Sequence, residues 1–239
     1  DEKVTAMVTQ REMDNESLIL MATKNGTIKK TKGYEYRNVR KNGLMAISLR
    51  EDDELISVKN TLPGAEILLI SRKGSAIRFN EKDARLSGRT SIGVRGMKLK
   101  SGDELVSMEI VDNEKTVLFV AENGIGKRTA FEEFSLQNRG GQGSKAYKIT
   151  QKTGDLIGTV SVSQGDEIMM ITTEGIIIRT TVDSVPVLGR TTSGVKLMNV
   201  NKEGNEKISS FARMNRSEED TGDLTDDASE PEMPEDNEE

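Results

Sequence analysis

The sequence predicts an all-β protein built as a propeller-like wheel of four-stranded blades. Three observations support this prediction: four tandem repeats of roughly 50 residues, short apolar runs bounded by glycine turns within each repeat, and no window with a sustained 3.6-residue apolar period. Repeats of about four strands each are typical of propellers, whereas helical solenoids need the longer apolar period that is missing here.

Each repeat begins with a predicted hairpin. An apolar run, such as LILMA or EILLI, is followed by a turn such as KNG or RKG and then by a strand that carries basic residues. Glycine supplies the positive φ that tight hairpin turns require. The hairpins cover residues 18–31, 66–79, 117–129 and 167–180, and their turn glycines are Gly26, Gly74, Gly124 and Gly175, spaced by 48, 50 and 51 residues.

A loop and two further strands follow each hairpin. The loop glycines Gly43, Gly93, Gly143 and Gly194 are spaced by 50, 50 and 51 residues, and third strands are expected at 43–49, 93–99, 143–149 and 194–200. A fourth strand recurs at residues 53–58, 103–108, 155–160 and 206–211, and a fifth copy of it opens the chain at 1–7. Because no repeat precedes that copy, we expect the chain to be a fragment of a longer protein.

These repeats define the predicted domain organisation. Residues 1–216 form one wheel fragment with blades at 1–50, 51–100, 101–150 and 151–201 and a trailing strand at 205–214. Residues 217–239 contain twelve acidic residues and no Lys or Arg, which predicts a disordered acidic tail. That tail serves either to keep the protein in solution or to compete with an acidic ligand for basic residues of the body.

Composition excludes several functions. The chain has no Cys and no His, which removes disulfides, thiol nucleophiles, imidazole bases and the usual zinc ligand sets. No apolar run approaches the roughly 18 residues of a membrane span, and the N-terminus does not resemble a signal peptide. We therefore expect a cytoplasmic protein with no membrane partner and no cofactor.

The net charge of −6 conceals a basic body. With the tail set aside, 34 basic residues face 28 acidic ones, a net charge of +6. Three positions of the repeat are recurrently basic, and the wheel would place them in a belt that neutralises successive phosphates of duplex DNA without reading its sequence. The predicted DNA-binding residues are Lys29, Lys30, Arg40, Arg78, Arg89, Arg95, Lys127, Arg128, Arg139, Gly140, Gly141, Lys145, Arg179, Arg190 and Lys196.

Other interpretations of these residues stay open. Any one of the cations could instead pair with a neighbouring carboxylate. The glycines Gly43, Gly93 and Gly194 fit plain turns, whereas Gly140 and Gly141 beside Arg139 exceed what a turn needs and favour function. The carboxylates at 52–54 and 166–167 could bind a metal in a hydrolase, although a solvated turn explains them as well.

The repeats, together with TKNGTIKKT, ENGIGKRT, GRTSIGVRGMKL and QNRGGQG, resemble the C-terminal domain of the DNA gyrase A protein over about residues 1–214. The resemblance implies a β-pinwheel, in which neighbouring blades exchange strands, and duplex DNA wrapped around its basic outer edge. QNRGGQG at 137–143 is similar to the family's gyrase-A box, QRRGGKG, with Asn138 and Gln142 in place of basic residues.

What the resemblance implies extends to the parent protein. That protein would be an ATP-dependent type II topoisomerase, acting on duplex DNA as a heterotetramer of the gyrase A core and gyrase B. This chain would carry no catalytic residue, support negative supercoiling and be monomeric and nucleoid-associated. The alternatives are the related domain of topoisomerase IV and a protein-interaction propeller whose basic edge binds an acidic partner.

Overall fold

A computed structural model describes residues 4–8, 16–201 and 204–214. The described residues contain fifteen strands, four short 3-10 helices and no α-helix, so the predicted all-β class is confirmed. Each repeat starts with an antiparallel hairpin: β1 (Leu18–Thr23) with β2 (Thr27–Lys32), β4 (Glu66–Ser71) with β5 (Ser75–Asn80), β8 (Thr116–Ala121) with β9 (Ile125–Ala130), and β12 (Glu167–Thr172) with β13 (Ile177–Thr181).

The 3-10 helices follow the second hairpin strand of each repeat. They span Gly33–Tyr36 (η1), Glu81–Asp83 (η2), Phe131–Glu133 (η3) and Val182–Ser184 (η4). In η2 and η4, the residue before the helix accepts a hydrogen bond from the first turn: Asn80 from the Lys82 N–H and Thr181 from the Asp183 N–H. Such side-chain caps satisfy N–H groups that a helix start leaves without partners.

Each hairpin gains a long strand from its own repeat. β3 (Leu55–Thr61) pairs with β1, β7 (Leu105–Ile110) with β4, β11 (Leu156–Val162) with β8, and β15 (Ile208–Met214) with β12. The predicted blade limits at 51, 101 and 151 are therefore wrong by one strand, because the fourth strand closes the blade of the preceding hairpin. The strand predicted to trail at 205–214 is an integral member of the fourth blade.

The remaining strands pass between blades. β6 (Val94–Arg95) pairs with β2, β10 (Ser144–Lys145) with β5, and β14 (Val195–Lys196) with β9, so each repeat donates a short strand to the blade before it. This confirms the strand exchange of a β-pinwheel. The third strands are shorter than the seven residues expected from the sequence. β6, β10 and β14 each contain only two residues, and residues 43–49 form no strand.

Apolar cores lie between neighbouring blades. The first cluster joins Leu20 and Ile28 of blade one to Ile67 and Phe79 of blade two, and two similar clusters join blades two to three and three to four. The inserted segments contribute Met97, Tyr147 and Met198, all at most 3% exposed. Burying apolar surface in this way is what holds each blade to the next.

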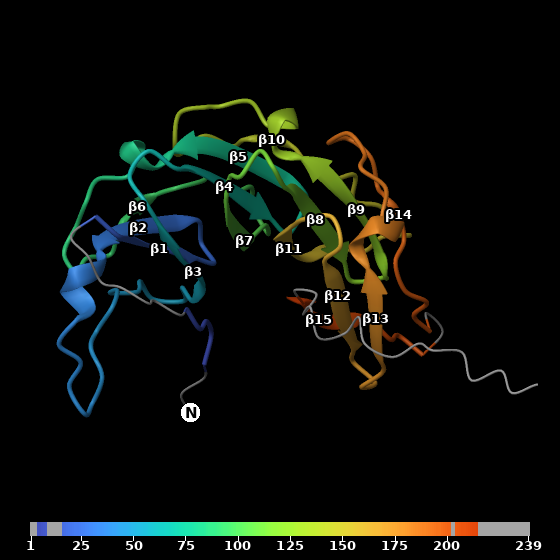
Figure 1. Ribbon diagram of the computed structural model, residues 1–239, viewed down its shortest axis with the longest axis horizontal. Coiled ribbons are helices and arrows are strands. Elements are labelled where there is room, and N and C mark those ends of the chain that lie inside the picture. Colours follow the sequence, from blue (N-terminus) through green and yellow to red (C-terminus); the bar gives the residue numbers. More distant parts are fainter. Residues whose placement is uncertain (1–3, 9–15, 202–203, 215–239) are drawn as a thin grey trace, which may run out of the picture.

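The four blades follow one another along an arch, with the first and the fourth at its two feet (Figure 1). The long strands β3, β7, β11 and β15 line the inner side, where β7 packs on both β3 and β11, and β11 packs on β15. The exchanged strands β6, β10 and β14 lie along the outer side (Figure 1).

Two predicted segments fall partly or wholly beyond the described residues. Of the strand expected at 1–7, residues 4–7 are described; they form no strand and are exposed. The acidic tail at 217–239 lies outside the described residues.

Within the described ranges, the chain contains no helix with the length and apolar character that crossing a bilayer requires.

Candidate nucleic-acid interface

Two of the predicted DNA-binding lysines are buried. Lys29 is 1% exposed and Lys127 is 0% exposed. The Lys127 ammonium donates hydrogen bonds to the carbonyls of Gly189 and Arg190 at 2.7 and 2.8 Å, and it lies 5.5 Å from the ring centroids of Phe119 and Tyr147. Such a group cannot reach a phosphate, so the prediction of direct DNA contact is wrong for both lysines.

Both lysines instead hold the loop of the next repeat, and Lys29 also holds that of its own. The Lys29 ammonium donates to the carbonyls of Ala46 and Arg89, as Lys127 does to that of Arg190. Burial lowers the pKa of each lysine to about 8. The sequence already contained a signal for this burial, because Ile77 and Ile178 occupy the equivalent position in the other two repeats.

This depressed pKa gives a testable pH dependence. Between pH 8 and 10 the unfolded chain binds more protons at Lys127 than the folded chain, so stability should rise with pH, by about 1 to 2 kcal/mol up to pH 9.5. Urea denaturation at pH 8 and 9.5 measures this rise. Lys127→Met should remove the part due to Lys127, while Lys82→Met, at an exposed site, should leave the rise unchanged. Equal rises in wild type and Lys127→Met would contradict the assignment.

The cations four residues after the hairpin glycines are also structural in three of the four repeats. Lys30 is buried and pairs with the carboxylate of Glu81. Arg78 pairs with Glu66 at 2.5 Å and donates to the carbonyl of Phe131 at 2.8 Å. Arg128 donates from Nε to the carbonyl of Val185 at 2.7 Å.

Lys30, Arg78 and Arg128 therefore join each blade to the 3-10 turn of the next repeat. The prediction of direct DNA contact is wrong for Lys30 and Arg78, because their polar groups are bound inside blade interfaces. Arg128 is partly exposed, and its contact with DNA stays a prediction. Arg179, in blade four, differs in being exposed, and it pairs with Glu167 of its own hairpin.

The loop arginines share one recurring contact. Arg89 donates to the carbonyl of Met45 at 3.4 Å, Arg139 donates to the carbonyl of Arg95, and Arg190 donates to the carbonyl of Lys145 at 3.0 Å. Each loop arginine therefore donates a hydrogen bond to a backbone carbonyl of the preceding loop, two residues after the glycine of that loop. All three remain partly exposed.

The exchanged strands carry exposed cations. Arg95 on β6, Lys145 on β10 and Lys196 on β14 are all exposed and occupy the same position in three successive repeats. Arg40 in the first loop is exposed as well. Sequence reasoning missed Lys98 and Lys148, which are exposed three residues after Arg95 and Lys145; their recurrence at the repeat spacing was the available signal.

The RGG loop is anchored to the loop before it. The Gly140 N–H donates to the carbonyl of Gly96 at 2.8 Å, and the Gly141 carbonyl accepts from the Lys98 N–H at 2.8 Å. Gly140 has a φ of +85°, which glycine adopts without strain. The Gly140 N–H is therefore used within the protein, whereas Gly141 is exposed on the outer side.

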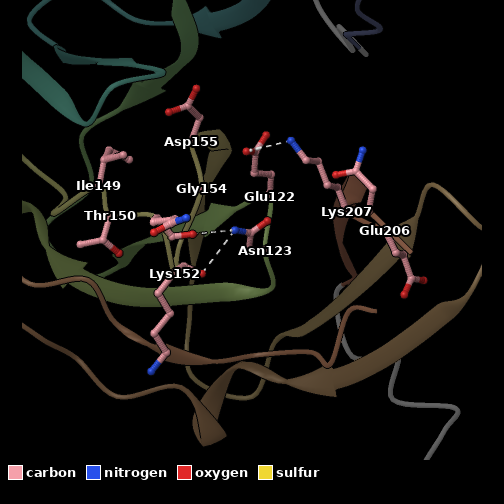
Figure 2. Close-up of a pocket in the computed structure, with 11 residues that line it drawn as sticks. Glu122, Asn123, Ile149, Thr150, Lys152, Gly154, Asp155, Glu206 and Lys207 are labelled. Carbon is pink, nitrogen blue, oxygen red and sulfur yellow. Dashed lines mark hydrogen bonds and ion pairs between the residues drawn. The ribbon is translucent and has the colours of Figure 1, made fainter. Parts of the chain in front are cut away.

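Acidic side chains occupy the face formed by the hairpin turns. A polar hollow of about 850 Å³ lies there between blades three and four (Figure 2). Its Glu122 pairs with Lys207 at 3.1 Å, and its Asp155 pairs with Lys73 at 2.7 Å. These two carboxylates are therefore already paired with neighbouring cations.

The carboxylates considered for a metal site have structural roles. Asp53 accepts hydrogen bonds from the Thr23 hydroxyl at 2.7 Å and the Asn25 N–H at 2.9 Å. Asp166 accepts from the Ser163 N–H at 2.8 Å, and Glu167 pairs with Arg179. Among the described residues, no group of three or more metal-ligating side chains is placed to hold an ion.

Comparison with known proteins identifies the family. The family model described as "DNA gyrase C-terminal domain, beta-propeller" matches residues 17–61, 65–112, 115–163 and 166–213, and each range agrees within two residues with one hairpin and its long strand. The chain belongs to the DNA gyrase C-terminal domain family. This confirms the resemblance predicted from the repeats and from QNRGGQG.

Relatives and solved structures agree with this assignment. This gyrase C-terminal domain is 40% identical over 215 residues to the DNA gyrase A protein of Buchnera aphidicola and 44% identical over 216 residues to that of Clostridium acetobutylicum, each match covering 90% of the chain. The chain spans about a quarter of those relatives (25% and 26%).

Among solved structures, a DNA gyrase A C-terminal domain matches with a TM-score of 0.76 and 29% identity, over 85% of this chain and 68% of that one. The C-terminal domain of a DNA topoisomerase IV matches with a TM-score of 0.79 at 24% identity, over 86% of this chain and 64% of that one. The second likeness shows a shared fold.

Proposed function

We propose that this domain binds duplex DNA without regard to sequence and wraps it along the outer side of the arch. The observation that carries the proposal is the placement of Arg95, Lys145 and Lys196, which are exposed at the same position of three successive exchanged strands. Cations repeated at the blade spacing can neutralise phosphates one after another along a bent duplex. The kinship with DNA gyrase A proteins supports this choice of ligand.

The anchoring of these strands favours a rigid track. Arg139 and Arg190 hold the backbone carbonyls of Arg95 and Lys145, so the residues that carry the exposed cations are fixed to the following repeat. Lys127 in turn holds the carbonyl of Arg190. A preorganised row of charges loses less conformational entropy on binding than a flexible one. The buried cations thus support the interface without touching the ligand.

The proposed role of the whole protein follows from the same kinship. We infer that the domain presents wrapped DNA to the catalytic core of an ATP-dependent type II topoisomerase, built from gyrase A and gyrase B, and so supports negative supercoiling near the nucleoid. In this proposal the domain itself has no catalytic role.

A salt titration tests the proposal against the alternative of an acidic protein partner. Binding of the domain to a duplex of random sequence should weaken steeply with salt, with a slope of log K against log salt of roughly −0.9 for each phosphate contacted. Fluorescence anisotropy over about 50 to 200 mM salt measures this slope. A flat dependence, or no binding at the low-salt end, would favour a protein partner instead.

A further inference from the structure

One position of the repeat is apolar and yet exposed in three successive repeats. The residues, with exposed fractions of 51%, 57% and 51%, are Leu86, Leu136 and Val187, spaced by 50 and 51 residues. The positions on either side carry unlike residues: Arg85, Ser135 and Pro186 before, and Ser87, Gln137 and Leu188 after. A single exposed leucine needs no explanation, but the same choice at one position of three repeats indicates a shared role.

Packing in the core does not account for this choice. The position two residues earlier is also apolar in all three repeats, and there the side chains are at most 2% exposed and join the clusters between blades: Ala84, Phe134 and Val185. The later position keeps its apolar character although about half of each side chain meets solvent. Its role is therefore to be sought outside the core.

The exposed apolar side chains belong to the outer edge of the blades. Leu86, Leu136 and Val187 form parallel bridges with β2, β5 and β9, respectively. These three strands are paired along their other edge with β1, β4 and β8. The bridges therefore lie along the edge that also receives the exchanged strands β6, β10 and β14 (Figure 1).

Along this edge the apolar residue and the exposed cation of a blade keep a fixed offset. The strand residue bridged to the apolar residue lies three residues after the one paired with the cation. The pairs are Thr27–Arg95 and Lys30–Leu86 on β2, Ser75–Lys145 and Arg78–Leu136 on β5, and Ile125–Lys196 and Arg128–Val187 on β9. Three residues of a strand span about 10 Å. Three blades thus present one cation and one apolar residue at the same separation.

The backbone around the apolar position is fixed to the outer strand. The N–H group that follows the apolar residue donates to a carbonyl of that strand in each blade: Ser87 to Lys30 at 2.9 Å, Gln137 to Arg78 at 2.8 Å, and Leu188 to Arg128 at 2.8 Å.

The side chains of the same three cations hold the turn that leads to the apolar residue. Arg78 donates to the carbonyl of Phe134 at 3.3 Å, and Arg128 donates to that of Val185 at 2.7 Å. Lys30 donates to the carbonyl of Glu81 at 3.0 Å. These cations therefore position the apolar side chains, and a surface fixed in this way loses little conformational entropy when it binds.

We propose that Leu86, Leu136 and Val187 contact the sugars and base edges of the minor groove of the wrapped duplex. The inference rests on the proposed DNA binding and adds a groove contact to the phosphate contacts. Proteins that bend DNA commonly place apolar side chains in the minor groove. That groove is about 6 Å wide, so a side chain about 10 Å from a bound phosphate reaches it. Sugar carbons are alike at every base pair, so this contact requires no particular sequence.

A salt titration separates the apolar contact from the phosphate contacts. Replacing Leu86, Leu136 and Val187 together with alanine should weaken binding to a random-sequence duplex roughly thirtyfold at every salt concentration, because apolar area is no longer buried. The slope of log K against log salt should not change, because the same number of counterions is released. Fluorescence anisotropy should therefore show a parallel downward shift of the line. Urea denaturation checks that the variant is folded.

Single substitutions keep the test decisive if the triple variant does not fold. Leu136→Ala should weaken binding roughly threefold, again without a change of slope. Leu62→Ala is the matched control, because Leu62 is 61% exposed but directly follows the inner strand β3. It should bind as the wild type does.

Two results would overturn the inference and leave the proposed DNA binding in place. If Leu136→Ala and the triple variant bind as the wild type does at every salt concentration, the apolar row does not touch DNA and is left for a protein partner. If the slope becomes shallower as the affinity falls, the lost contacts are ionic. Failure of the proposed function looks different, because the wild type itself would then show a flat line or no binding.

Discussion

Replacing Arg95, Lys145 and Lys196 together with alanine is expected to weaken duplex DNA binding roughly a hundredfold at about 0.1 M salt, because three charge-assisted phosphate contacts are lost. The slope of log K against log salt should become shallower by about 2.7, or 0.9 for each lost contact. The three side chains are exposed on the outer side, so the fold should be unaffected. Fluorescence anisotropy measures both the affinity and the slope.

A second triple variant controls for net charge. Lys24, Lys115 and Lys207 lie outside the exchanged strands and pair with acids, at 3.5, 3.0 and 3.1 Å from Glu54, Asp112 and Glu122. Their replacement by alanine changes the net charge equally. If only the overall charge attracted DNA, both triples would lose the same affinity, and the outer row of cations would not be the interface.

Arg78→Ala is expected to destabilise the domain by about 3 kcal/mol, and it should leave the DNA affinity of the folded protein nearly unchanged. The substitution leaves Glu66 half-buried without its cation and removes the hydrogen bonds to the carbonyls of Phe131 and Phe134 at 2.8 and 3.3 Å. Breaking a largely buried ion pair typically costs about 3 to 5 kcal/mol. Urea denaturation measures the loss of stability.

Arg179→Ala is the matched control for that substitution. Arg179 occupies the same repeat position and pairs with Glu167, as Arg78 does with Glu66, but its side chain is 45% exposed against 12% for Arg78. An exposed pair contributes at most about 1 kcal/mol. Equal destabilisation by the two substitutions, or a large loss of DNA affinity in folded Arg78→Ala protein, would contradict the structural role of Arg78.

The repeat pattern is enough to predict the fold class. Glycine turns at a fixed spacing and apolar runs of strand length are local signals, so the predicted hairpins lie close to their observed limits. The predicted blade limits are wrong because sequence order does not say whether the strand at 55–61 pairs with the hairpin before it or after it. The register of β3 with β1 decides this, and it depends on contacts between segments some 40 residues apart.

The interface is harder to predict for a related reason. A basic residue on a strand suggests a solvent-facing side chain, yet Lys30 lies opposite Leu20 in a sheet that the next repeat covers. Only packing between repeats shows which cations are used internally. Lys29 and Lys127 are the exceptions, because the isoleucines at the equivalent positions already mark that site as buried.

The most direct test of the account is whether the domain changes the linking number of DNA. Relaxed closed plasmid is incubated with the domain and a nicking-closing enzyme, and its topoisomers are then separated on a gel. Wrapping along the outer side of the arch predicts a shift in linking number that grows with the ratio of protein to plasmid and disappears in the Arg95, Lys145 and Lys196 triple variant. Binding of wild-type protein to the plasmid without any shift would contradict the account.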